Sequence, residues 1–159
     1  MVEGAKMKYF TKEYIELCKD KKVQELRPDI KCGDYCINIE RSHMFLNTED
    51  YEPGRKEYRN NLTWLPTGDQ LDEEIVKICE KKTIIPKPNI DGYSISYHFD
   101  MFFDKEKKYY NAKIICFKEF DKGGLKSGAL DRTIEFTDTN PLIAKILLLI
   151  QLLEQKWPK

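Results

Sequence analysis

The segment YSISYHFDMFF (93–103) constrains the fold of this chain more than any other. Apolar and polar side chains alternate along it, as they do in a strand that buries one face. The charged residues DKEKK then predict a turn, and YYNAKIICFKEF (109–120) predicts the returning strand of a hairpin. Because apolar residues fall on both faces of this second strand, we expect it to be central and covered on two sides.

Two longer helices are expected on either side of this hairpin in the sequence. Thr67 and Gln70 match a capping box, in which each side chain bonds to the other residue's backbone N–H, so a helix should begin here and run to about Lys82. Trp64, just ahead of it, is expected to pack beneath this helix rather than to stack on a ligand. Asn140 and Pro141 are typical of the cap and first residue of a second, strongly apolar helix.

The order of these elements predicts an α+β fold. With a third short strand at RTIEF (132–136), the antiparallel sheet would be sandwiched between the two helices, an α/β/α arrangement formed by residues 63–159. Residues 1–62 are expected to add a small extension packed on this body. It consists of a helix capped by Thr11 and a half-buried strand in DYCINIE (34–40).

Charge and hydropathy exclude several classes of partner. The 27 Lys and Arg residues balance 27 Asp and Glu, so the net charge does not indicate binding to duplex nucleic acid. The longest apolar run, residues 146–150, is too short to span a membrane. Because the first ten residues lack the apolar core of a secretory signal, a cytoplasmic location is expected.

The five cysteines are scattered, which suits reduced thiols better than a disulfide framework. Cys32 and Cys36 have C-x3-C spacing and are followed by His43, so a zinc site is conceivable. Structural zinc sites usually show tighter pairs and a second pair, and this one has neither. We therefore predict no metal and no cofactor.

Two segments have the chemistry to bind an anion the size of a nucleotide. Arg41, Arg55, Lys56 and Arg59 alternate with tyrosines, which combines guanidinium groups with stacking rings, although acidic neighbours dilute the cluster and a solvated loop is the alternative. The glycine-rich stretch KGGLKSGA (122–129) is expected to be a flexible loop that can direct N–H groups toward a phosphate, but it lacks the spacing of a Walker motif. The predicted ligand-binding residues are Arg41, Arg55, Tyr58, Arg59, Lys126 and Ser127.

One pair of residues invites a catalytic interpretation. His98 and Asp100 share a strand face and have the chemistry of a general acid and base. The sequence places no nucleophile beside them, and a lone histidine on a half-exposed strand is usually solvated. We predict no catalytic residue and a protein that is not an enzyme.

Residues 63–155 resemble the phage ABA-sandwich domain, a family of small bacteriophage and prophage proteins. The resemblance rests on WLPTGDQLDEEI, on the hairpin YSISYHFDMFF to IICFKEF, and on TDTNPLIAKILLLIQLLE. Upstream, YIELCKDKKVQELRPDIKCGDY is similar to N-terminal segments of other proteins from phages of Firmicutes. The resemblance implies an α/β/α sandwich and an accessory role in the host cytoplasm, and it supplies no catalytic residues.

These observations lead to one main functional hypothesis and two alternatives. The main hypothesis is a non-enzymatic phage protein that sequesters a small, nucleotide-like host immune signal and so acts against antiphage defence. The first alternative is a protein that inhibits a host enzyme by direct contact. The second is a hydrolase of a nucleotide signal that uses His98 and Asp100. An open sheet edge and aromatic-rich strands are also consistent with a homodimer.

Overall fold

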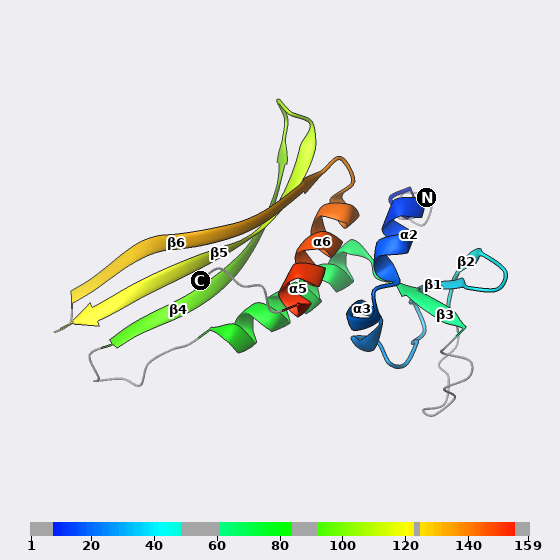
Figure 1. Ribbon diagram of the computed structural model, residues 1–159, viewed down its shortest axis with the longest axis horizontal. Helices are drawn as coiled ribbons and strands as arrows, with labels where there is room; N and C mark the ends of the chain where they lie inside the picture. Colours follow the sequence, from blue (N-terminus) through cyan, green and yellow to red (C-terminus); the bar gives the residue numbers. More distant parts are fainter. Residues whose placement is uncertain (1–7, 49–60, 84–91, 123–124, 155–159) are drawn as a thin grey trace.

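The computed structural model describes residues 8–48, 61–83, 92–122 and 125–154, and it confirms the α+β class (Figure 1). One antiparallel sheet has the strand order β2-β1-β3 and the other has the order β4-β5-β6. The N-terminal elements are α2 (Lys12–Cys18), α3 (Lys21–Glu25), β1 (Tyr35–Asn38), β2 (His43–Leu46) and β3 (Leu62–Leu65). The later elements are α5 (Gly68–Lys82), β4 (Gly92–Asp104), β5 (Tyr109–Lys122), β6 (Leu125–Asp138) and α6 (Pro141–Leu153).

The helix capped by Thr11 and the strand in residues 34–40 form where the sequence predicts them. Thr11 caps α2 by accepting a hydrogen bond from Tyr14 N at 3.3 Å, which confirms the predicted start of the first helix. Gly33 has a φ of 92° in the turn before β1, a conformation that residues with a Cβ rarely adopt. In β1, Tyr35 pairs with Leu46 of β2 on one side and with Leu65 of β3 on the other.

The long sheet confirms the predicted hairpin and corrects the third strand. The predicted turn is present, since Asp104 O accepts from Lys108 N at 2.8 Å between β4 and β5. The prediction of a flexible loop over 121–131 is wrong, because β6 begins at Leu125 and pairs with β5 from Lys122 onward. Pairing with β5 supplies backbone hydrogen bonds to a stretch whose glycine-rich sequence has no clear alternation.

The layer order also differs from the expected one, because α5 and α6 lie on the same face of the long sheet (Figure 1). The sheet residues that join the core with both helices all point to one side. They are Tyr97, Phe99, Met101, Ala112, Ile114, Ile134 and Phe136. On the other side no described helix or strand covers the sheet, and there Ile115 and Phe117 are only half-buried. Apolar residues on both faces of β5 therefore do not reflect cover on two sides.

The helices instead lie between the two sheets, and a single main core joins the N-terminal elements to the rest (Figure 1). Tyr14 of α2 is fully buried in this core, and its hydroxyl donates to the carbonyl of Pro66, just ahead of α5. Trp64 is buried, with 1% of its surface exposed, as a packing role requires. It belongs, however, to a second cluster with Ile30 and Cys36, on the far face of the small sheet and not beneath α5.

Candidate ligand-binding groove

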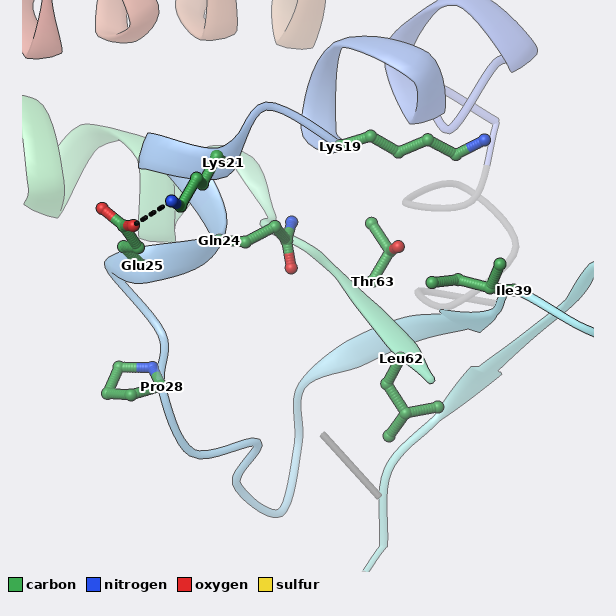
Figure 2. A pocket seen from close by; sticks show the side chains of 8 residues that line it. All are labelled: Lys19, Lys21, Gln24, Glu25, Pro28, Ile39, Leu62 and Thr63. Carbon is green, nitrogen blue, oxygen red and sulfur yellow. Dashed lines mark ion pairs between the residues drawn. The ribbon is translucent and has the colours of Figure 1, made fainter. Parts of the chain in front are cut away.

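A groove of about 590 Å³ lies between α3 and the small sheet (Figure 2). Its walls come from α3 and the residues on either side of it, from β3, and from the residue that follows β1. The lining residues are Lys19, Lys21, Gln24, Glu25, Pro28, Ile39, Leu62 and Thr63. Segments from three separate parts of the sequence thus meet at one site.

The helical wall of the groove is fixed by its cap and by one glutamine. Asp20 caps α3 by accepting from Lys22 N at 2.9 Å and from Val23 N at 3.3 Å. Gln24 Nε2 then donates to Cys18 O at 2.6 Å and to Trp64 O at 3.0 Å, while its Oε1 accepts from Trp64 N at 2.8 Å. Gln24 therefore ties α3 to β3 and sets the width of the groove.

The groove combines an apolar surface with positive charge. Ile39 supplies an apolar surface that is 56% exposed, whereas Leu62, also in the lining, is 3% exposed. Lys19 and Lys21 supply two ammonium groups, of which Lys19 donates to Glu16 at 2.7 Å, and Glu25 supplies a carboxylate. In Figure 2 Lys21 and Glu25 lie together, with Lys21 Nζ 3.9 Å from Glu25 Oε1. Such a surface suits an organic anion with a flat, weakly polar part.

An ion pair joins the residues that follow α3 to the residue that precedes β1. Arg27 Nε and Nη2 donate to the two carboxylate oxygens of Asp34 at 2.9 and 2.7 Å, a bidentate contact. Asp34 is 1% exposed and also accepts from Lys31 N and from Gln70 Nε2. Burial by itself raises the pKa of the Asp34 carboxyl, but these hydrogen bonds and the Arg27 charge outweigh it and hold the pKa below its ordinary value.

The same network joins the groove to the main body. The Arg27 guanidinium lies 5.7 Å from the Trp64 ring centroid, which is within the range of a cation–π contact. Gln70 bonds to Asp34 with its Nε2 while its Oε1 accepts from Thr67 N at 2.9 Å, as part of the capping box of α5. A shift of α3 would therefore be transmitted to the start of α5.

The structure places only part of the predicted anion-binding cluster. Arg41 lies in the exposed turn between β1 and β2, two residues after Ile39 of the groove. Arg55, Tyr58 and Arg59 lie outside the described residues. Asn61 is the first residue that the structure describes after these three. Its carbonyl oxygen accepts from Ile39 N at 3.0 Å, so both Asn61 and Arg41 lie close to the groove.

The predicted glycine-rich site lies elsewhere. The backbone of Lys126 and Ser127 belongs to β6, where these residues pair with Asp121 and Phe120 of β5. The start of β6 and the β1–β2 turn are at opposite ends of the long axis of the molecule (Figure 1). Of the predicted residues that the structure describes, Arg41 is therefore not brought together with the backbone of Lys126 and Ser127.

The strand face that carries His98 and Asp100 holds a contact that the sequence analysis missed. His98 Nε2 lies 3.0 Å from Ser96 Oγ, so a hydroxyl does stand beside this histidine. Asp100 interacts instead with Lys113, whose Nζ is 3.9 Å away, and no hydrogen bond joins Asp100 to His98 in the described part of the chain. Alternation at i and i+2 along β4 was the signal that could have found Ser96.

The cysteines do not gather around an ion. Cys36 is fully buried in the second cluster, whereas Cys32 is exposed and its thiol donates to Thr48 O at 3.4 Å. Among the described residues, no group of three or more His, Cys, Asp or Glu side chains is arranged to hold a metal.

No family model matches this sequence, and no match was found among curated proteins or solved structures. Across the described residues, no helix is both long enough and apolar enough to cross a bilayer.

The groove itself was not anticipated from the sequence. Lys19 and Lys21 belong to an ordinary charged stretch, and nothing local distinguishes them from other surface lysines. Ile39 was assigned to a half-buried strand face, where an apolar residue is expected. Because β1 ends at Asn38, Ile39 is not part of that strand face, and its side chain lines the groove instead.

Proposed function

We propose that this protein is a non-enzymatic binding protein that captures a small, nucleotide-like anion in the groove between α3 and the small sheet. The observation that carries the proposal is the exposed side chain of Ile39 in a groove whose rim holds Lys19 and Lys21. Ligand pockets typically measure about 300–1,000 Å³, and the groove falls within that range.

The groove suits such a ligand in two ways. A nucleobase or similar ring would lie against Ile39, which removes apolar surface from water. Phosphate oxygens would lie near the Lys19 and Lys21 ammonium groups, with Arg41 on the neighbouring turn as a further cation. Because Gln24 is held by three hydrogen bonds, little ordering of this wall would be required on binding.

The biological role we propose follows from the resemblance to phage accessory proteins and not from the groove. In a bacterial host cytoplasm, a protein that captures a nucleotide-like immune signal would lower its free concentration and blunt antiphage defence. Sequestration needs affinity but no chemistry, which agrees with an open groove that contains lysines and a glutamate. This step is an analogy between classes of protein.

Thermal unfolding in the presence of mono-, di- and cyclic nucleotides tests the proposal. A captured ligand raises the melting temperature in a concentration-dependent manner. The substitution Lys21→Glu should abolish the rise, and Lys77→Glu is the matched control, since both lysines are exposed on a helix and pair with a glutamate of that helix. If no nucleotide of the panel raises the melting temperature, or if both variants respond as the wild type does, the groove is not the site.

The chemical state of the ligand separates capture from hydrolysis. A sequestering protein returns an intact nucleotide after heat denaturation of the complex, as judged by mass spectrometry. A hydrolase that used His98 with Ser96 would return an altered nucleotide and would lose turnover in His98→Ala. Recovery of an altered ligand from the wild type would overturn a non-enzymatic role.

Inhibition of a host protein is the second candidate, and one structural feature favours it. Phe103 at the end of β4 is 46% exposed, and its ring lies 4.8 Å from that of Tyr110. Exposed aromatic pairs of this kind are common in protein interfaces. Affinity purification from host lysate should then recover a host protein with the wild type and lose it with Phe103→Ser, whereas recovery by both variants excludes this surface.

A further inference from the structure

The long sheet has one face that no described helix or strand covers, and we call it the open face. It is lined by Ser96, His98, Asp100 and Phe102 of β4, by Asn111, Lys113, Ile115 and Phe117 of β5, and by Thr133, Glu135 and Thr137 of β6. The helices occupy the opposite face only (Figure 1). The open face is therefore available to another molecule along the described part of the sheet.

The open face carries apolar side chains among its polar ones. Ile115 and Phe117 lie on the central strand and are half-buried, and Phe102 on the neighbouring strand is 42% exposed. Lys113 Nζ lies 5.1 Å from the centroid of the Phe102 ring, so a charge lies directly beside this apolar surface. Protein interfaces commonly combine exposed aromatic rings with charged groups.

The size of the open face fits a dimer. The three strands have 13 or 14 residues each, so the face is about 45 Å long and about 14 Å wide, roughly 600 Å². Two such faces related by an axis near Ile114 overlap over roughly four fifths of this length and would bury about 1,000 Å², the smallest area expected of a specific interface. A second sheet of equal length is the occupant that covers it most fully.

We propose that the open face binds the open face of a second copy of this chain, about a twofold axis that crosses the strands between Ile115 and Lys113. The register of the sheet places His98 level with Ile115, and Asp100 level with Lys113. Rotation about this axis puts His98 of each copy opposite Asp100 of the other. An imidazole that can donate a hydrogen bond thus faces a carboxylate that can accept one, twice in one symmetric interface.

The third strand adds a second reciprocal contact. Thr133 is level with Ile115, and Glu135 is level with Lys113. The same rotation therefore places each Thr133 hydroxyl opposite a Glu135 carboxylate. Ile115 would lie over the aliphatic part of Lys113 from the second copy, which covers the exposed apolar centre.

Charge argues against the other way of stacking two such faces. A twofold axis along β5 would put Lys113 opposite Lys113 of the second copy. It would also put Asp100 opposite Glu135, because both are level with Lys113. Like charges held opposite each other destabilise an interface, so the axis across the strands is favoured.

Sedimentation equilibrium tests the dimer directly. The wild type should show twice the chain mass of 18.9 kDa, Ile115→Glu should be monomeric, and Val76→Glu should remain dimeric. Val76 is the matched control because it is 41% exposed on α5, away from the open face. A wild type that is monomeric at its highest soluble concentration, or a dimer that persists in Ile115→Glu, overturns the proposal.

A charge exchange tests the axis and protects the result against misfolding. His98→Glu should weaken the dimer roughly tenfold, since it opposes two carboxylates across the interface. His98→Glu combined with Asp100→Lys should restore the dimer, and failure to restore it overturns the proposed axis. If circular dichroism shows that Ile115→Glu is unfolded, Phe102→Asp replaces it, because Phe102 is largely exposed.

The dimer and the groove are independent. The groove lies on the small sheet, and Ile115→Glu should leave the nucleotide-induced rise in melting temperature unchanged. Conversely, Lys21→Glu should leave the mass of the dimer unchanged. Each proposal can thus fail without the other.

Discussion

Gln24 of α3 bonds to both backbone groups of Trp64 in β3, with its Nε2 3.0 Å from Trp64 O and its Oε1 2.8 Å from Trp64 N. The side-chain amide thereby takes the place of a neighbouring strand at the edge of the small sheet, where β3 is the last strand. An uncovered strand edge can pair with another chain, and this contact blocks it at Trp64. Gln24, which sets the width of the groove, thus also hinders pairing of β3 with a strand of another chain.

Replacing Gln24 should therefore cost stability as well as binding. Gln24→Ala leaves Trp64 N and two carbonyl oxygens without these partners in a partly buried place, so the free energy of unfolding should fall by about 1–3 kcal/mol. Urea denaturation measures this change. The neighbouring Lys22→Ala is the control, since Lys22 is exposed, and an equal loss in both variants would mean that the hydrogen bonds of Gln24 do not account for its effect.

The Asp34 carboxylate is expected to be the most sensitive polar group of the N-terminal region. Asp34→Ala removes the partner of Arg27 and leaves that guanidinium partly buried without its carboxylate, at a cost of about 3–5 kcal/mol. Arg27→Lys keeps the charge but loses the bidentate geometry, so it should cost less. Chemical denaturation of both variants checks the order, and an Arg27→Lys variant as unstable as Asp34→Ala would contradict it.

The pKa of Asp34 also predicts a pH dependence. Because this pKa is lower in the folded state, the unfolded chain binds more protons below its own carboxyl pKa of about 3.9. The stabilisation is fully present above that value and is lost as the pH falls through the folded pKa. The difference in stability between the wild type and Asp34→Asn should therefore shrink as the pH is lowered below about 4, and a constant difference would exclude this origin.

Local patterns in the sequence predict the elements of this fold well. Thr11 and Asn140 cap helices where expected, and the alternation in β4 assigns each side chain to the correct face. These features depend on neighbours within a few residues, which sequence patterns record directly. The start of β6 was missed because a glycine-rich strand is held by pairing with β5, and that pairing leaves little local pattern.

The arrangement of layers and the groove could not be predicted in the same way. Alternation along a strand separates two faces but does not say which face a helix will cover, and Ile115 was misinterpreted for that reason. The groove joins Lys21 to Ile39 and Leu62, which are brought together only by the pairing of β1 with β3 and by the Gln24 contact. Charge patterns identified Arg41 near this site but not the lysines that line it.

The capping box of α5 yields a graded set of stabilities. Thr67→Ala removes the bond from Gln70 N to the Thr67 hydroxyl at 3.3 Å and should cost about 1 kcal/mol, whereas Thr67→Ser keeps the hydroxyl and should be nearly neutral. Gln70→Ala should cost more than Thr67→Ala, because Gln70 also donates to Asp34 at 2.9 Å. Thermal unfolding of the three variants measures the order.

The link between Gln70 and Asp34 can be separated from capping by a double-mutant cycle. If the two side chains stabilise the fold together, Gln70→Ala should cost less in an Asp34→Ala background, which has no acceptor for Gln70 Nε2, than in the wild type. If the stability losses of the two single variants add up to that of the double variant, the contact with Asp34 contributes nothing to the effect of Gln70, and only the capping hydrogen bonds remain to explain it.

The last prediction concerns the five cysteines, whose reactivity should report on the fold. Burial raises the pKa of the Cys18 thiol to about 12, against a smaller lowering by its hydrogen bond with Tyr14. Burial, with the charge of Glu80, raises the pKa of Cys79 to about 11. Because the thiolate is the reactive form, both should be inert at pH 8 in the folded protein.

Cys32 is exposed, and Cys36 and Cys116 are almost fully buried. Iodoacetamide should therefore add one group to the native chain, at Cys32, and five groups in denaturant, as counted by mass spectrometry. Cys32→Ser should remove the native adduct and leave four in denaturant. Rapid modification of Cys18 in the native protein would show that the contact between α2 and α6 opens readily, because that thiol lies in the core where these helices meet.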